Sequence, residues 1–206
     1  MKNFLKFVLV ICLMFVVTNM QAQIKFGPKV GLNLSTMTYK SFGIAYDPKT
    51  LVGFNVGVIS EIPLTGNLVL QPGILYSAKG SKYSVLSEET TVSPSFLEIP
   101  VNVVYKFDLG AAKLFLNAGP YVAYGIGGKI KSGGDSEDIT FGKTENDDLK
   151  PLDFGLNVGA GIEISNIAIS VNYGLGLANL APITTNDTEM KIKVIGFSVA
   201  YLFGGK

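Results

Sequence analysis

Hydrophobic and polar residues alternate along most of the chain after Ile24, and this period of two predicts β-strands with two unlike faces. In segment 167–177, Ile, Val, Tyr and Leu occupy one face, and Ala, Ser, Asn and Gly occupy the other. Segment 152–164 repeats this arrangement. The same pattern predicts eight strands, near residues 24–38, 50–63, 68–83, 95–107, 114–126, 151–164, 167–177 and 189–203.

The predicted connections are of two kinds that alternate along the chain. Three of them are short, at residues 64–67, 108–113 and 165–166. The other four are long and polar, at residues 39–49, 84–94, 127–150 and 178–188. Short periplasmic turns and longer external loops are typical of bacterial outer-membrane barrels, in which strands of about 9–11 residues cross the bilayer at a tilt. The pattern therefore predicts an all-β, eight-stranded, antiparallel up-and-down transmembrane β-barrel.

The small residues indicate which face of the strands is enclosed. Glycine is concentrated on the polar face, and it suits the narrow interior of an eight-stranded barrel. A soluble barrel would instead place the bulky face inside. We therefore expect the apolar face to contact lipid, with aromatic girdles at the two interfaces formed by Phe26, Phe54, Tyr76, Tyr105, Phe107, Tyr124, Phe154, Tyr173, Tyr201 and Phe203.

The enclosed face also carries charged residues, four positive and four negative. They are Lys25, Lys29, Lys79 and Lys106 with Glu61, Glu98, Asp153 and Glu163. Buried charges need partners, so an ion-pair network in the lumen is the economical interpretation. Amide side chains fill the remaining space in this interpretation, at Asn33, Asn55, Gln71, Asn102, Asn117, Asn157 and Asn172. We predict no open aqueous pore, because eight strands leave room only for side chains.

The start of the chain predicts export. Lys2 and Lys6 precede an apolar run at residues 7–17, followed by a polar segment, as in a cleavable secretory signal peptide. We expect cleavage after Ala22, which leaves residues 1–22 as the signal peptide and 23–206 as the barrel domain. Cys12, the single cysteine, lies in the apolar run. No apolar stretch reaches 18 residues, so a helical span is not expected.

Composition excludes several function classes. Without Lys2 and Lys6, 17 − 2 = 15 lysines face 16 acidic residues, and the chain has no arginine. A basic patch for nucleic acid is therefore not expected. The sequence contains no histidine, which hydrolases of the Ser-His or Asp-His type use as proton shuttle. We expect a protein without catalytic residues, cofactor or metal.

Three local patterns have a functional and a structural interpretation. Residues 125–129 are similar to a phosphate-binding loop, but Ile130 stands where that motif needs Ser or Thr, which favours a strand entering a loop.

The acidic residues of loop 127–150 suit Ca²⁺ as ligands without matching a calcium-loop spacing, so a solvated, mobile external loop is the favoured alternative. A short hairpin near residues 139–141 is a further option. Glu98 and Glu163 are interpreted as ion-pair partners and not as an acid pair.

Four segments resemble the PorT-like outer-membrane β-barrel family of Gram-negative bacteria. They are Phe26 to Ser35, Leu70 to Ser77, Leu97 to Val101 and Gly196 to Phe203, the last of which resembles the terminal strand that barrel-assembly machinery recognises. The resemblance implies a barrel in the cell outer membrane, and some relatives assist protein secretion and gliding. It implies no ligand-binding residues for this chain.

We thus expect a non-enzymatic outer-membrane barrel, with a structural, adhesive or assembly role through its external loops. The alternatives are an accessory factor of a secretion or gliding apparatus and a small-ligand-binding barrel. The expected partners are outer-membrane lipid, the assembly machinery and a protein of unknown identity at the loops.

Overall fold

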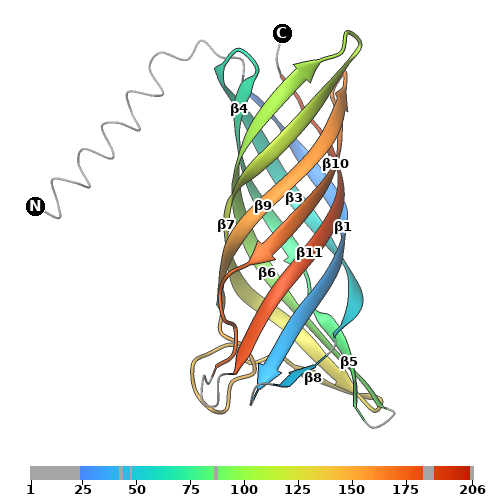
Figure 1. Cartoon of the computed structure of the whole chain (residues 1–206), viewed down its shortest axis with the longest axis vertical. Helices are drawn as coiled ribbons and strands as arrows, with labels where there is room; N and C mark the ends of the chain where they lie inside the picture. The colour runs from blue at the N-terminus through green and yellow to red at the C-terminus, as the bar shows by residue number, and fades with distance from the viewer. Residues whose placement is uncertain (1–23, 42–43, 47, 86–87, 183–187, 205–206) are drawn as a thin grey trace, which may run out of the picture.

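The computed structural model describes residues 24–41, 44–46, 48–85, 88–182 and 188–204. The predicted signal peptide lies outside these residues. Within them, no helix is long and apolar enough to cross a membrane. The chain forms a closed cylinder of antiparallel strands that are tilted against its long axis (Figure 1). Eight main strands make the ring: β1 (Lys25–Ser41), β3 (Lys49–Thr65), β4 (Leu68–Ala78), β6 (Glu88–Asp108), β7 (Ala112–Ser132), β9 (Leu152–Ile164), β10 (Ile167–Gly176) and β11 (Glu189–Tyr201).

Closure of the ring comes from the pairing of its first and last strands. β1 pairs with β11 from Lys29–Ala200 to Lys40–Glu189, and a bridge joins Phe26 to Phe203. Every other main strand pairs with its neighbour in the chain. This topology confirms the predicted eight-stranded up-and-down barrel.

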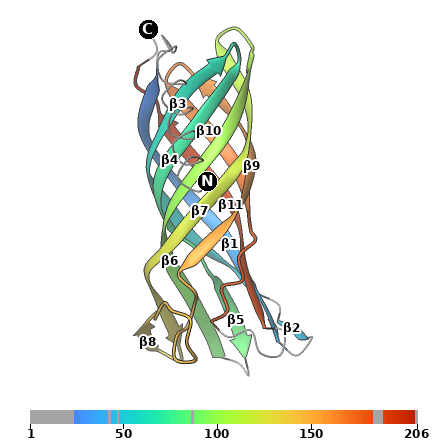
Figure 2. The same ribbon diagram turned by 90° about the vertical axis from the view of Figure 1, so that its left-hand side faces the viewer.

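The two ends of the cylinder differ. The three short turns lie together at the upper end in Figure 1, near the end of β11. Gly66 and Gly110 have positive φ in two of these turns, which suits glycine. At the lower end lie three shorter strands that extend the sheet: β2 (Ile44–Tyr46), β5 (Ser81–Val85) and β8 (Asp135–Asp138) (Figures 1 and 2). We take the lower end as external, because long connections face outward in such barrels.

Two of the predicted boundaries are wrong at this external end. The strand predicted at 68–83 is broken after Ala78, and β5 resumes at Ser81 to pair with β6. β6 and β7 are 21 residues each, so most of the predicted loop 84–94 is strand. The reason is mutual pairing: Thr91 lies opposite Lys131 and Ser81 opposite Val92. Polar strands of this kind lack the apolar alternation by which a membrane strand is recognised.

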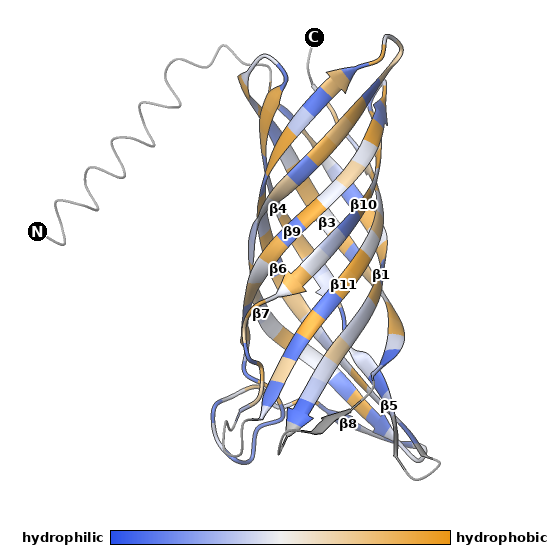
Figure 3. Cartoon of the chain, viewed as in Figure 1, coloured by the Kyte–Doolittle hydropathy of each residue, from blue (hydrophilic) through white to orange (hydrophobic). Residues whose placement is uncertain are grey.

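The outer wall is apolar and the interior is mixed. Outward-facing residues such as Ile169, Val158 and Phe197 are 49%, 55% and 47% exposed, whereas inward neighbours such as Ala168 and Ser198 are buried. Figure 3 shows the resulting alternation of hydrophobic and hydrophilic bands along each strand. An exposed apolar belt of this extent requires lipid around it.

Three prolines interrupt the hydrogen-bonding ladder in adjacent parts of the wall. Pro72 falls in a gap of the β3–β4 ladder, between the pairs Ile59–Gly73 and Ile62–Leu70. Pro100 falls in a gap between β4 and β6, and Pro120 in one between β6 and β7. Proline has no N–H to donate to a ladder. The gaps follow one another across three successive strand pairs, and we call this line the proline diagonal.

Candidate functional site in the barrel interior

An ionic cluster fills the periplasmic end of the lumen. The Lys106 ammonium on β6 lies 2.5 Å from a carboxylate oxygen of Glu61 on β3 and 2.5 Å from one of Glu163 on β9. Lys25 on β1 lies 2.7 Å from the second Glu163 oxygen, and Gln71 donates to Glu61 at 3.2 Å. Four strands thus contribute two positive and two negative charges, and their pairing offsets much of the cost of burial.

An apolar layer lies at the level of the ionic cluster, where Ala168 is opposite Glu163 and Phe115 is opposite Lys106, and an amide layer lies nearer the middle of the lumen. The apolar layer consists of Ile59, Val69, Leu75, Val104, Phe115, Ala168, Ala200 and Leu202. In the amide layer, Asn33 accepts from Asn55 at 2.8 Å and donates to Ser77 at 3.1 Å. Glycine makes the room: a Cβ atom at Gly161 would lie 2.3 Å from the Phe115 ring.

A second charged cluster lies nearer the external end. Lys79 forms an ion pair with Glu98, and its ammonium lies 4.7 Å from the centre of the Tyr121 ring. The Tyr121 hydroxyl donates to Asp153 Oδ2 at 3.1 Å. Asp153 is fully buried, and its other oxygen has no hydrogen-bond partner among the described residues. Asp153 is therefore held by a tyrosine, whereas Glu98 is held by a lysine.

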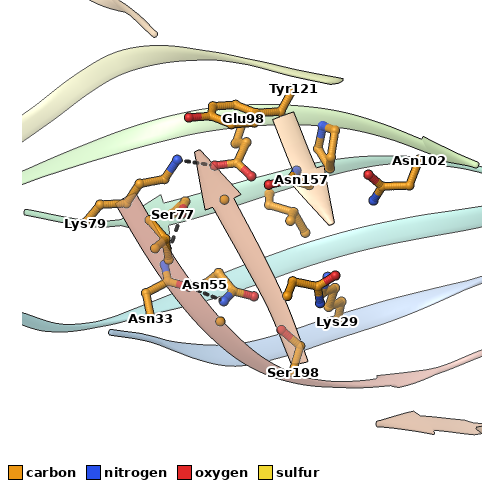
Figure 4. A pocket seen from close by; sticks show the side chains of 16 residues that line it. Lys29, Asn33, Asn55, Ser77, Lys79, Glu98, Asn102, Tyr121, Asn157 and Ser198 are labelled. Carbon is orange, nitrogen blue, oxygen red and sulfur yellow. Dashed lines mark hydrogen bonds and ion pairs between the residues drawn. The ribbon is translucent and has the colours of Figure 1, made fainter. Parts of the chain in front are cut away.

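Lys29 is the exception among the predicted interior charges. No carboxylate of the described residues lies within 4 Å of its ammonium, so the structure does not bring it into either cluster. It lines a cavity of about 60 Å³ with Asn55, Asn102 and Ser198 (Figure 4). This volume suits a few water molecules, which hydrogen-bond well to such polar walls.

Apolar side chains pack together at the external mouth, and we call this group the external plug. Segment 139–151 follows β8 and folds back over the mouth, where Ile139 is 7% exposed and Leu149 is 2% exposed. They pack with residues of the wall and of the last loop, namely Met37, Phe96, Tyr121, Ala123, Ala178, Leu180 and Ile192. The backbone N–H of Lys150 donates to the Leu180 carbonyl at 2.8 Å, which ties the two loops together.

The predicted loop 127–150 is exposed over most of its length, as expected, but part of it is regular strand and two of its apolar residues are buried. Its first part continues β7 and turns into β8, with Lys129 opposite Asp138. The expected short hairpin is present, but its second strand is β8 and not segment 139–141: only Ile139 continues the ladder, with its N–H donating to the Gly128 carbonyl at 3.0 Å. The side chains of Ile139 and Phe141 pack into the mouth. Sequence reasoning missed the plug residues, although isolated apolar residues inside a charged loop were a usable signal.

Two carboxylates of this loop accept hydrogen bonds from residues of the same loop. Asp148 accepts from the Thr140 N–H and hydroxyl, both at 2.8 Å, and Asp147 accepts from the Thr144 N–H at 2.7 Å. Hydrogen bonds from the Thr144 side chain and backbone hold the pKa of Asp147 below its ordinary value of 3.8. Among the described residues, no group of three or more Asp, Glu, Cys or His is placed to hold a metal ion.

The predicted girdle aromatics lie toward the two ends of the outer wall. Near the periplasmic rim, the rings of Tyr105 and Phe107 pack edge-on at 4.8 Å between centroids, and those of Tyr201 and Phe203 pack at a tilt at 4.7 Å. Phe26 lies 6.2 Å from Phe203. Phe54 and Tyr76 pack at 5.5 Å toward the external half, where Tyr124, Phe154 and Tyr173 are also exposed. Tyr76 is half-buried, and its hydroxyl bonds to Ser95 at 2.7 Å.

Two other patterns also have definite places. Residues 125–129, which are similar to a phosphate loop, lie within strand β7, and no helix follows them in the described part of the chain. Glu98 and Glu163 belong to the two separate charged clusters, each with its own lysine.

With this architecture established, comparisons with known proteins place the chain in a family. Residues 18–181 match the family described as outer membrane protein beta-barrel domain. The chain belongs to this family. It is accordingly an outer-membrane β-barrel protein of the cell outer membrane, and its apolar wall is the lipid-facing surface.

Solved structures with a similar barrel share little sequence with this family member. Neisserial surface protein A is 14% identical with a TM-score of 0.44, and the match covers 85% of this chain and 97% of that chain. Ail of Yersinia pestis is 16% identical with a TM-score of 0.43, covering 87% and 98%. The outer membrane enzyme PagL is 15% identical with a TM-score of 0.43, covering 82% and 98%. A comparison with curated protein sequences finds no match.

Proposed function

We propose that this protein is a non-enzymatic outer-membrane barrel with a closed lumen, and that it works through its external surface in a structural, adhesive or assembly role. The observation that carries the proposal is the external plug. Ile139, Leu149 and Leu180 close the mouth above an interior already filled by paired charges and amides. A barrel with this interior has no continuous path for solutes.

Cavity sizes support a closed lumen. The cavity beside Lys29 measures about 60 Å³, and the one at the periplasmic mouth, lined by Lys25, Glu61 and Lys113, measures about 130 Å³. Pockets for small-molecule ligands are usually about 300–1,000 Å³. These two cavities suit water, so they do not favour a role as a small-ligand-binding barrel.

The interior chemistry supports a non-enzymatic role. The sequence has no histidine to shuttle protons near neutral pH. Glu98 and Glu163 are engaged by lysines, and Asp153 is fully buried beneath the plug. A catalytic acid needs contact with its substrate, and these carboxylates have no route to one from lipid or from outside.

The external end offers the surface on which a partner could act. β5, β6, β7 and β8 continue one polar sheet beyond the apolar belt (Figure 2). All four residues of β8 are exposed. Functional contacts in rigid barrels are usually made by such loop and hairpin regions.

Conductance in planar bilayers tests the closed lumen. Reconstituted wild-type protein should insert as heat-modifiable β-structure and give no stable current steps. A variant in which residues 139–150 are replaced by a Gly-Ser linker of equal length serves as the comparison. It removes Ile139 and Leu149 from the external plug and leaves the strands unchanged. Large, stable single-channel currents from the wild-type protein would refute the proposal.

A second candidate is an accessory role in protein secretion, favoured by the resemblance of Leu70 to Ser77 and Leu97 to Val101 to the PorT-like family. The matched family is broader, so this role rests on that resemblance alone. Deletion of the gene, followed by comparison of the secreted proteins, tests it. An unchanged set of secreted proteins would remove this candidate and leave the first proposal intact.

A further inference from the structure

The external end of β11 carries two lysines on its lipid-facing side. Along this strand the outward positions Phe197 and Ile195 are 47% and 44% exposed. The next outward positions are Lys193 and Lys191, because Ile192 between them is buried in the external plug. The outward face of β11 thus changes from apolar to cationic at Lys193. Figure 3 shows hydrophilic bands at the external ends of β1 and β11.

β1 completes a cationic patch beside these lysines. Its outward residues lie opposite those of β11 in the pairs Thr36–Lys193, Thr38–Lys191 and Lys40–Glu189. We call the six residues of these pairs the rim patch. Its formal charge is three lysines minus one glutamate, 3 − 1 = +2. The patch is therefore a local excess of positive charge on the wall.

Lys193 lies at the boundary of the apolar belt. Its neighbour on β10 is Leu175, and the next outward residue toward the membrane is Ile195. Among the described residues, no carboxylate forms an ion pair with Lys193, whereas Lys191 is paired with Glu189. Lys129 of the β7–β8 hairpin differs, because it lies 3.9 Å from Asp138. Positive charge is thus left uncompensated next to lipid.

We propose that the rim patch binds the phosphate groups of a glycolipid in the outer leaflet. The acyl chains of such a lipid lie against the apolar wall at Leu175 and Ile195, and its phosphates meet the ammonium groups of Lys191 and Lys193. The hydroxyl of Thr36 is an additional hydrogen-bond donor on the same face, whereas the hydroxyl of Thr38 already donates to the Lys191 carbonyl at 3.2 Å. The proposal rests on the outer-membrane location and goes beyond the proposed function, because it names a lipid site.

The position of the lysines explains why a lipid is favoured over a soluble partner. A lysine at the edge of hydrocarbon extends its aliphatic stem along the apolar surface and places its ammonium at headgroup level. The patch is continuous with the lipid-facing wall, so a molecule that covers both must be amphipathic and anionic. Each lysine near an anionic membrane surface strengthens binding by a factor of about 5.

Native mass spectrometry of the full-length barrel in detergent tests this site. The probe is diphosphorylated lipid A, compared with the same lipid after phosphatase treatment. The variant Lys191→Gln/Lys193→Gln should bind the diphosphorylated lipid about 25-fold more weakly than wild type, from two lysines at about 5-fold each. Lys191→Arg/Lys193→Arg keeps the charge and should retain binding. The matched control, Lys129→Gln/Lys131→Gln, removes two charges from the β7–β8 hairpin and should bind as wild type does.

Three outcomes would overturn the proposal. One is equal binding by Lys191→Gln/Lys193→Gln and wild type while both show the heat-modifiable mobility of a folded barrel. Another is equal loss in the Lys129→Gln/Lys131→Gln control, which would indicate general charge attraction. The third is equal binding of the dephosphorylated lipid, which would show that the phosphates of the lipid are not what is recognised. None of these outcomes bears on whether the lumen is closed.

Discussion

The ring of Phe141, in the segment after β8, meets the ring of Phe96 on β6 edge-on, with centroids 6.1 Å apart and planes at 71°. Phe141 has this place because the wall beside it is a glycine: a Cβ atom at Gly125 would lie 2.3 Å from its ring. Edge-to-face aromatic contacts of this kind are favourable beyond the area that they bury. The external plug is therefore a docked part of the barrel.

Substitution of Gly125 should loosen the external plug. Gly125→Ala places a methyl group where the Phe141 ring now lies, and overpacking of this kind costs about 1–3 kcal/mol. We expect an added protease to cut segment 139–151 faster than in wild type when the barrel is embedded in vesicles. Gly127→Ala is the matched control, since its new Cβ would meet nothing within 4 Å. Equal cleavage of the two variants would contradict the docking of Phe141.

Removal of Lys106 should destabilise the barrel strongly. Lys106→Met leaves Glu61 without its lysine and Glu163 with only Lys25, and breaking a buried ion pair from one side costs about 3–5 kcal/mol. Reversible urea unfolding in lipid vesicles measures the change in the free energy of unfolding. Tyrosine fluorescence reports it, because the chain has no tryptophan. A loss below 1 kcal/mol would show that water, and not Lys106, satisfies the two carboxylates.

Lys29→Met should behave in the opposite way. Lys29 gains no ion pair within the described residues, so its removal takes away a desolvated charge and leaves no carboxylate newly unpaired. We expect the free energy of unfolding to change by less than about 1 kcal/mol, or to rise. The same urea assay decides the matter. A loss as large as that of Lys106→Met would imply that Lys29 has a partner in the membrane-embedded protein.

The contrast between these two lysines shows how far the sequence alone could lead. Alternation placed both in the lumen, and it placed Ile169 and Val158 on the wall, because only one face of each strand can be apolar in lipid. The ion-pair partners could not be predicted from the sequence, because they depend on the stagger of the strands around the ring. Lys25 lies opposite Glu61 in register, yet it bonds to Glu163 on β9. The plug was missed because Leu149 and Leu180 find each other only after the barrel brings distant loops together.

The fold of the external loop should depend on pH. The pKa of Asp147 lies below 3.8 in the folded loop because Thr144 donates to its carboxylate. Its contribution is therefore present above the ordinary value of 3.8 and is lost as the pH falls through the lower folded pKa. The protection of the Thr144 amide, which is its exchange rate relative to that of an unstructured amide at the same pH, should decrease under these acidic conditions. Asp147→Asn should exchange faster near neutral pH and respond less to acid, and an identical pH profile in both proteins would contradict this assignment.

The proline diagonal is a line along which the barrel wall has fewer inter-strand hydrogen bonds. At Pro72, Pro100 and Pro120 each strand keeps its ladder with one neighbour and has a gap in the ladder with the other. We expect the barrel to deform along this line first, because neighbouring strands elsewhere can separate only by breaking ladder hydrogen bonds. When the surrounding bilayer thins or thickens, the cross-section of the barrel should therefore flatten along this line while β9, β10 and β11 keep their shape.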